Sequence, residues 1–151
     1  MIVRTAVLDD VSRLSDLGEI FYLSTILPQF ADYDRDSISA LLIGCIESDM
    51  SIVLVMETDG IIVGGFTGMV IPLYWNVGVL AAQQIAWFVH PDHRGPKSLK
   101  LLSTFEKWAE DMGATIFFSG AKTDPALLGM DAVLRRKGYE QLERIYVKGV
   151  R

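Results

Sequence analysis

The chain has 151 residues, half of them hydrophobic, which suits one domain with a single covered core and leaves little room for a second. Its 14 basic and 19 acidic side chains give a formal net charge of −5, which excludes the strongly basic surface of a general nucleic-acid binder. Residues 1–90 carry three basic and eleven acidic side chains, whereas residues 91–151 carry eleven basic and eight acidic ones. We therefore expect an anionic ligand to bind the C-terminal part and a cationic partner to be drawn to the first part.

Targeting and redox signals are weak in this chain. The longest apolar run, residues 61–73, is broken by glycine and proline and is too short to span a membrane. The N-terminus lacks the charged and apolar regions of a secretory signal. Cys45 lies in a helical apolar pattern, which favours a buried structural thiol over a nucleophile, and a single cysteine cannot form an internal disulfide. We expect a soluble, cytoplasmic protein that uses no membrane and no metal.

The first predicted elements are a strand and two helices. Residues 1–5 form a short candidate strand, and apolar side chains at helical spacing predict a helix over residues 11–21. Turn-forming residues in 27–36 predict a loop. Ser37 is the predicted cap of a helix that runs to about Ser48.

A β-hairpin is the clearest local signal. Residues 51–58 and 61–71 are rich in β-branched and apolar side chains, and Asp59-Gly60 between them is a strong hairpin turn. Residues 72–79 are predicted to be a loop.

The second half alternates strands with helices. A strand is predicted over residues 80–89, a helix over 97–112 that Gly113 ends, and a buried strand over 115–119. The remaining predicted elements are a helix over residues 125–137, stopped by Gly138, and a strand over residues 139–148. This order predicts a single mixed α/β (α+β) domain over residues 1–151.

A basic turn marked by proline and glycine, Val89-His90-Pro91-Asp92-His93-Arg94-Gly95-Pro96-Lys97, joins a predicted strand to a predicted helix. The first amides of a helix are unpaired and carry partial positive charge, so such a turn binds phosphate well. Gly95 allows close approach to the backbone, and Pro96 suits a first helical turn. On spacing alone, an ordinary strand-to-helix connection with solvated charges is the alternative. Neither the dinucleotide nor the P-loop glycine pattern is present.

The pattern Val89-x-Pro91-x-x-Arg94-Gly95, followed by a helix with Leu101-Leu102, resembles motif A of the GNAT superfamily of N-acetyltransferases. The element order, the hairpin with Gly64-Gly65 and the late Gly138-Tyr139 extend this resemblance over nearly the whole chain. It implies a mixed central sheet of six to seven strands flanked by about four helices, and acetyl-CoA as the co-substrate. The Arg94-Gly95-Pro96-Lys97 loop is similar to that of some phage-encoded members.

The resemblance also implies site residues. It assigns acetyl-CoA contacts to Trp87, Phe88, Val89, Arg94, Gly95, Pro96, Lys97, Ser98 and Leu99. Among these, Arg94, Lys97 and Ser98 are the expected phosphate ligands, because Pro96 has no amide hydrogen. The chain departs from the usual loop by having Lys97 and Leu99 at two positions where the family has small residues.

Acetyl transfer to an amine needs a base, an oxyanion donor and a leaving-group acid. The resemblance implies the backbone amide of Phe88 or Val89 as the oxyanion donor. The family's usual tyrosine acid is replaced by Leu134, which leaves Tyr146 as a substitute, with Tyr139 more simply structural. Gln83 and Gln84 stand where many members have a glutamate. Candidate bases are then His90, Glu57, Asp92, His93, or a water molecule held by Gln84.

Three functions remain open at this point. The first is an acetyl-CoA-dependent N-acetyltransferase acting on a small amine, or on a lysine or N-terminal amine of a protein. A second is a non-catalytic CoA-binding or interaction module, which the missing acid and base favour. A third is a phage nucleobase-modifying relative of the Mom proteins, against which the net charge argues. Family members often dimerise through sheet edges, so a homodimer is expected.

Overall fold

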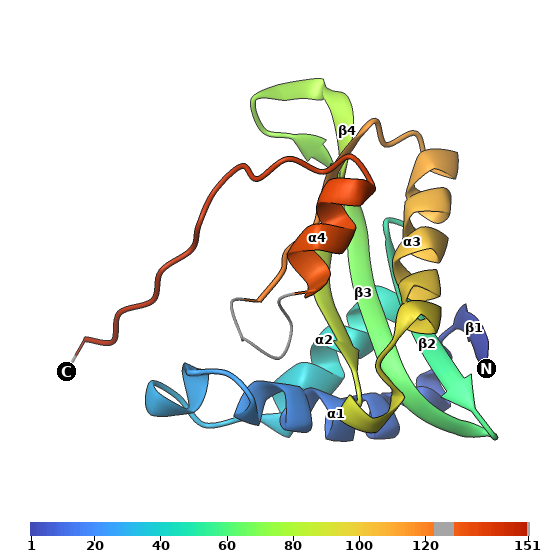
Figure 1. The fold of residues 1–151 in the computed structure, drawn as a ribbon, viewed down its shortest axis with the longest axis vertical. Coiled ribbons are helices and arrows are strands. Elements are labelled where there is room, and N and C mark those ends of the chain that lie inside the picture. The colour runs from blue at the N-terminus through green and yellow to red at the C-terminus, as the bar shows by residue number, and fades with distance from the viewer. Residues whose placement is uncertain (123–128, 151) are drawn as a thin grey trace. The chain divides into compact units, whose positions relative to one another are not determined.

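The computed structural model describes residues 1–122 and 129–150. The chain divides into two compact units, Met1–Phe118 and Ser119–Arg151. The first unit contains one sheet whose strands lie in sequence order (Figure 1). They are β1 (Ile2–Thr5), β2 (Ser51–Thr58), β3 (Ile61–Leu73), β4 (Asn76–Val89) and β5 (Ile116–Phe118). Neighbouring strands are antiparallel except for β4 and β5, which are parallel.

Three helices cover this sheet: α1 (Val11–Leu23), α2 (Arg35–Glu47) and α3 (Leu99–Asp111). Leu14, Leu42 and Cys45 pack with Val53 and Val55 in one core cluster, so α1 and α2 cover one face. Since side chains alternate along a strand, the neighbouring residues of β2 face the other side, which α3 covers. Residues 52–56 are all buried because both faces are covered. The predicted structural role of Cys45 is consistent with its 5% exposure.

Close packing against α3 requires a glycine in β3. A Cβ atom on Gly68 would lie 2.2 Å from Cε2 of Phe105. The Phe105 ring is 1% exposed and lies 4.7 Å, centroid to centroid, from the ring of Phe66. The sheet and α3 therefore approach each other at this point as closely as a backbone without a side chain allows.

The hairpin turn between β2 and β3 has the predicted form, with positive φ at Asp59 (51°) and Gly60 (77°). The predicted loop over residues 72–79 is wrong, because β3 runs to Leu73 and β4 starts at Asn76. Pro72 is tolerated since it lies beyond Met69, the last β3 residue that pairs with β2.

The β3–β4 hairpin contains no charged residue from Ile61 to Val89. Its tip carries Tyr74 and Trp75, which are 75% and 78% exposed and whose ring centroids lie 4.2 Å apart. The hairpin is therefore uncharged along its whole length and carries two exposed aromatic rings, tilted by 37°, at its turn.

Two helix starts differ from the sequence predictions. The cap of α2 is Asp34, whose Oδ1 accepts the amide hydrogens of Asp36 (3.0 Å) and Ser37 (3.4 Å). Ser37 is the third residue of the helix, so its hydroxyl donates to the Asp34 carboxylate instead of capping the helix. Before α3, residues 96–98 form a 3-10 turn, so α3 begins at Leu99 rather than Lys97.

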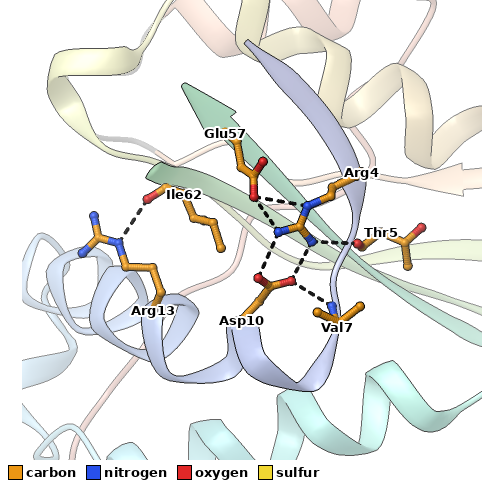
Figure 2. Close-up of polar contacts among 7 residues, drawn as sticks. All are labelled: Arg4, Thr5, Val7, Asp10, Arg13, Glu57 and Ile62. Atoms are coloured by element: carbon orange, nitrogen blue, oxygen red, sulfur yellow. Dashed lines mark hydrogen bonds and ion pairs between the residues drawn. The ribbon is translucent and has the colours of Figure 1, made fainter. Parts of the chain in front are cut away.

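A charged cluster joins β1, β2 and the start of α1 (Figure 2). Arg4 donates from Nη1 and Nη2 to the Asp10 carboxylate at 2.7 and 3.0 Å, and from Nη2 to Oε1 of Glu57 at 2.5 Å. Asp10 also accepts the Val7 amide hydrogen at 2.8 Å. The hydrogen bonds from Arg4 lower the pKa of Asp10, although burial opposes the shift. These bonds connect β1, β2 and the start of α1.

The second unit contains α4 (Gly129–Arg136). The helix stops as predicted: Gly138 has φ +90°, and the Tyr139 amide donates back to the Leu134 carbonyl at 3.0 Å. The predicted strand over residues 139–148 is wrong. This segment is irregular and extends away from α4 (Figure 1), with Ile145 and Tyr146 89% and 85% exposed. Its β-branched and aromatic residues suit a strand, but no described strand pairs with it. The described sheet therefore has five strands, not six to seven.

Candidate functional site

The C-terminal half of β4 has an open edge. The parallel pairing of β4 with β5 ends where Gln83 meets Phe118, while β3 continues to pair with β4 as far as Val89. Within the described residues, the stretch from Gln84 to Val89 has no strand on its β5 side. Backbone groups along this edge can bond an extended ligand in the way that a further strand would.

A β-bulge lies at the start of the open edge. Thr67 pairs with Ala86 and Gly68 pairs with Gln84, which leaves Ile85 without a partner in β3. A bulge bends its strand and increases the local twist. The open edge therefore begins where β4 bends.

The register shows which backbone groups point to that edge. The His90 amide donates to the Val63 carbonyl at 2.8 Å, and Gly64 pairs with Val89 in the next position. In an antiparallel pair, directly bonded and non-bonded positions alternate. The N–H and C=O groups of Val89 therefore point away from β3, as do those of Trp87, whereas Phe88 lies at a bonded position opposite Gly65.

The loop after Val89 places unpaired amides beside open space. Gly95 has φ +153°, which favours glycine, and a Cβ atom there would meet nothing within 4 Å. In the described part of the chain, the amides of Gly95 and Lys97 have no hydrogen-bond acceptor. Both residues are exposed. This arrangement leaves room and donors for an anion immediately before α3.

Ser98 holds the loop rather than facing outward. Its amide and its hydroxyl both donate to the Gly95 carbonyl, at 3.0 and 2.6 Å, and the residue is 8% exposed. Pro96 is exposed and Leu99 is half-buried. Contact of these three residues with a phosphate stays a prediction.

The basic side chains of the loop differ in direction. Nε of Arg94 donates to the Val89 carbonyl at 3.0 Å, and Cζ lies 5.8 Å from the centroid of the Phe88 ring. The Arg94 side chain thus folds back on the end of β4. Lys97 is exposed and forms no ion pair with a described residue. Asp92 is the single carboxylate between Val89 and Leu99, so the loop has a net positive charge.

The candidate bases have structural partners. Nδ1 of His90 accepts the Asp92 amide hydrogen at 3.4 Å and caps the 3-10 turn over residues 91–93. A neutral His90 in this arrangement carries its proton on Nε2. Gln84 lies half-buried opposite Gly68, and Glu57 is paired with Arg4. Tyr146 belongs to the second unit.

Sequence reasoning missed one contact behind the site. The Phe88 ring packs against the ring of Phe21 in α1, with centroids 5.3 Å apart. Helical spacing places Phe21 on the apolar face of α1, but no sequence rule pairs it with a particular strand residue. The end of β4 is thereby held from the core side.

Among the described residues, no group of three or more His, Cys, Asp or Glu side chains is placed to bind a metal ion. Among the described helices, none has the length and apolar character needed to span a membrane.

No protein-family description matches the chain, and no curated protein is similar to it in sequence. Solved structures with the same fold do exist. An aminoglycoside acetyltransferase from an uncultured soil metagenomic sample has 18% identity and a TM-score of 0.74, covering 99% of this chain and 98% of its own. The aminoglycoside acetyltransferase AAC(6')-Iy, in complex with a bisubstrate analogue of CoA and acetylneamine, has 16% identity and a TM-score of 0.76, covering 99% and 97%.

A third neighbour is a ribosomal-protein-alanine N-acetyltransferase from Brucella melitensis biovar Abortus 2308. It has 18% identity and a TM-score of 0.69, and the match covers 99% of this chain and all of the neighbour. Identities this low show the fold alone. The chain has the mixed α/β fold of the GNAT acetyltransferases.

Proposed function

We propose that the protein is an acetyl-CoA-dependent N-acetyltransferase that transfers acetyl directly to a primary amine. The observation that carries this proposal is the continuity of two features: the open edge of β4 runs directly into a basic loop with free amides. An acyl-pantetheine chain ending in a pyrophosphate has the same order of parts. Among proteins with this fold, AAC(6')-Iy binds CoA and a CoA-linked analogue.

Two sets of residues would bind the two parts of acetyl-CoA: the open edge of β4 would bind the pantetheine arm, and the loop before α3 would bind the pyrophosphate. The outward N–H and C=O groups of Trp87 would bond the pantetheine arm, which leaves the Val89 N–H for the thioester end. The amides of Gly95 and Lys97 would hold the pyrophosphate, with the Lys97 ammonium adding a full charge and α3 its partial charge. Arg94, Pro96, Ser98 and Leu99 shape this loop.

In the reaction, the amine nitrogen attacks the thioester carbon and the carbonyl oxygen takes up negative charge. We assign the oxyanion donor to the Val89 amide rather than that of Phe88, because only the former points to the open edge. The C–S bond then breaks, the acetyl group stays on nitrogen, and the sulfur leaves as a thiolate. The amine loses one proton and the thiolate gains one.

The groups that move these protons are candidates. His90 and a water molecule held by Gln84 are the candidate bases, and Tyr146 is the candidate acid. His90→Asn keeps a side-chain acceptor for the Asp92 amide but removes the imidazole, so it separates the capping role from the basic one. A lower rate of acetyl transfer in this variant, with an unchanged thermal midpoint, would identify His90 as the base.

We propose a cationic amine as the acceptor. The acidic excess of residues 1–90 supports a cationic partner. Neighbours are named as aminoglycoside acetyltransferases and as a ribosomal-protein-alanine N-acetyltransferase. Both kinds of acceptor present a primary amine beside other polar groups.

The test combines binding with turnover. Acetyl-CoA and CoA should raise the thermal midpoint of the protein, because a ligand at about 100 times its Kd stabilises the folded state by about 2.7 kcal/mol. Release of the CoA thiol is then followed with kanamycin, an alanine-initiated peptide and a lysine peptide. Absence of any shift with acetyl-CoA would contradict the proposal.

A non-catalytic CoA-binding module is the second candidate. Leu134, at the position of the family's usual tyrosine acid, is 7% exposed and has no proton to donate. A thermal shift with acetyl-CoA but no thiol release with any amine would favour this function.

Further assignments belong to the same proposal. The neighbours match this chain over nearly its full length, which supports one acetyltransferase domain over residues 1–151. The variant loop from Arg94 to Lys97 supports a phage-type member. A cytoplasmic location and a homodimer also remain proposals.

A further inference from the structure

Arg94 is tied to the end of β4 by two contacts. Its Nε atom donates to the Val89 carbonyl at 3.0 Å, and its guanidinium lies over the Phe88 ring with Cζ 5.8 Å from the centroid. Phe88 is 9% exposed and rests on the core through Phe21. A side chain that served only as a phosphate ligand would gain nothing from lying along the strand it follows.

The peptide group between Val89 and His90 is held from both sides. Its N–H donates to the Val63 carbonyl at 2.8 Å, toward β3, and its carbonyl accepts Nε of Arg94 on the opposite side. A peptide unit bonded at both ends cannot rotate without losing one of the bonds. The direction of the preceding Val89 N–H, which shares an α-carbon with this unit, is thereby restricted.

We propose that Arg94 is a positioning residue that orients the Val89 backbone for acetyl transfer, rather than a ligand of the pyrophosphate. The inference rests on the proposed function, since it concerns the same open edge. Arg94 acts through Val89: it fixes the carbonyl so that the amide stays aimed at the oxyanion. Lys97, which is exposed and has no ion-pair partner among residues 1–122 and 129–150, is the side chain available to the phosphates.

Two acetyl donors separate these roles. Acetyl-CoA carries the pyrophosphate, whereas S-acetyl-pantetheine has the same thioester and arm without any phosphate. Steady-state rates are measured with both donors and with the amine from the panel above that gives the highest rate. Variants are Arg94→Met, Arg94→Lys and Lys97→Met, with Arg35→Met as the matched control. Arg35 is also exposed and also donates its guanidinium to a backbone carbonyl, that of Ser12 at 2.9 Å.

The positioning role predicts that Arg94→Met lowers kcat by about 10- to 100-fold with both donors, since a misplaced catalytic group has effects of this size. Arg94→Lys should fail in the same way, because it keeps the charge but loses the planar Nε donor. Lys97→Met should instead raise KM for acetyl-CoA, with its loss confined to the donor that has a pyrophosphate. Arg35→Met should leave both donors unaffected.

The opposite pattern would overturn the inference: Arg94→Met raises KM for acetyl-CoA alone, or Arg94→Lys restores the rate. Circular dichroism and the thermal midpoint of each ligand-free variant ensure that folded proteins are compared. If the wild-type protein transfers acetyl from neither donor, the proposed function fails first and the positioning role fails with it. The two failures are therefore distinguishable.

Discussion

The backbone of Gly68 in β3 lies directly against the ring of Phe105 in α3, so close that a Cβ atom would stand 2.2 Å from Cε2. The ring cannot withdraw, because it is fully buried between Phe66 and Trp108, at centroid distances of 4.7 and 6.0 Å. This contact sets the separation between the sheet and α3, the helix that follows the loop of residues 90–98.

Gly68→Ala should therefore destabilise the protein by about 1–3 kcal/mol, the usual cost of overpacking a core. The matched control is Gly44→Ala in α2, where a Cβ atom meets nothing within 4 Å. That variant should gain roughly 0.5–1 kcal/mol from helix propensity. Urea denaturation of the three proteins measures both effects, and equal midpoints for the two variants would contradict the packing argument.

The Arg4–Asp10 pair predicts a dependence of stability on acid pH. Hydrogen bonds from Arg4 lower the pKa of Asp10 below its ordinary value of 3.8. A carboxyl whose pKa is lowered on folding adds stability at pH values above its unfolded pKa, and this stability is lost as the pH falls through the folded pKa. Asp10→Asn should cost about 1–2 kcal/mol at pH 7, at the lower end for charged hydrogen bonds because Arg4 is 35% exposed.

The free energy of unfolding of both proteins is measured by urea titration from pH 7 to pH 2.5. The difference between wild type and Asp10→Asn should stay constant above about pH 5 and shrink below pH 3.8. A difference that persists at pH 2.5 would show that the Asp10 charge is not its origin.

The cap of α2 is tested by a pair of substitutions. Asp34→Ala should lower the thermal midpoint more than Ser37→Ala, because Asp34 accepts two backbone amides whereas Ser37 only supports Asp34. Far-ultraviolet circular dichroism during thermal unfolding gives both midpoints. The reverse order would restore Ser37 as the cap.

Substitutions at Gly95 and Gly60 distinguish an effect on acetyl-CoA binding from an effect on stability alone. Gly95→Ala places a side chain at φ +153° in the space assigned to the pyrophosphate, so it should raise the Kd for acetyl-CoA by at least about tenfold. Gly60→Ala strains the β2–β3 turn at φ +77° and should cost roughly 1 kcal/mol of stability. It should leave the Kd unchanged. Isothermal titration with acetyl-CoA measures the binding, and an equal Kd for Gly95→Ala and wild type would exclude the loop as the phosphate site.

The sequence predicted most elements because their signals are local. Asp59-Gly60 supplies the positive φ angles of its turn, and Gly113 and Gly138 end their helices with φ near +90°. The wrong predictions concern segments whose secondary structure depends on tertiary contacts. Pro72 reads as a loop signal, but it occupies a strand position that β2 does not reach. Residues 139–148 have strand-forming side chains, and pairing requires a partner that local sequence does not specify.

At the candidate site, the sequence predicts which segment is involved but not where its backbone amides and side chains point. A strand, a basic turn and a helix in succession predict an anion site in this segment. Which backbone amide faces outward depends on the register between β3 and β4, and on the bulge at Ile85. The path of the Arg94 side chain depends on the Val89 carbonyl and the Phe88 ring. Neither contact can be inferred from residue type, so the sequence alone predicts a phosphate ligand at Arg94 and not its contacts with Val89 and Phe88.

The uncharged β3–β4 hairpin also has a consequence for how the chain must fold. Long apolar strands without lysine, glutamate or proline gatekeepers readily pair with identical strands of other molecules while they are exposed. From Ile61 to Val89 no residue is charged and Pro72 is the one proline, and Tyr74 and Trp75 at the tip stay exposed in the folded protein. Refolding at high protein concentration should therefore favour aggregation through this hairpin until β3 pairs with β2.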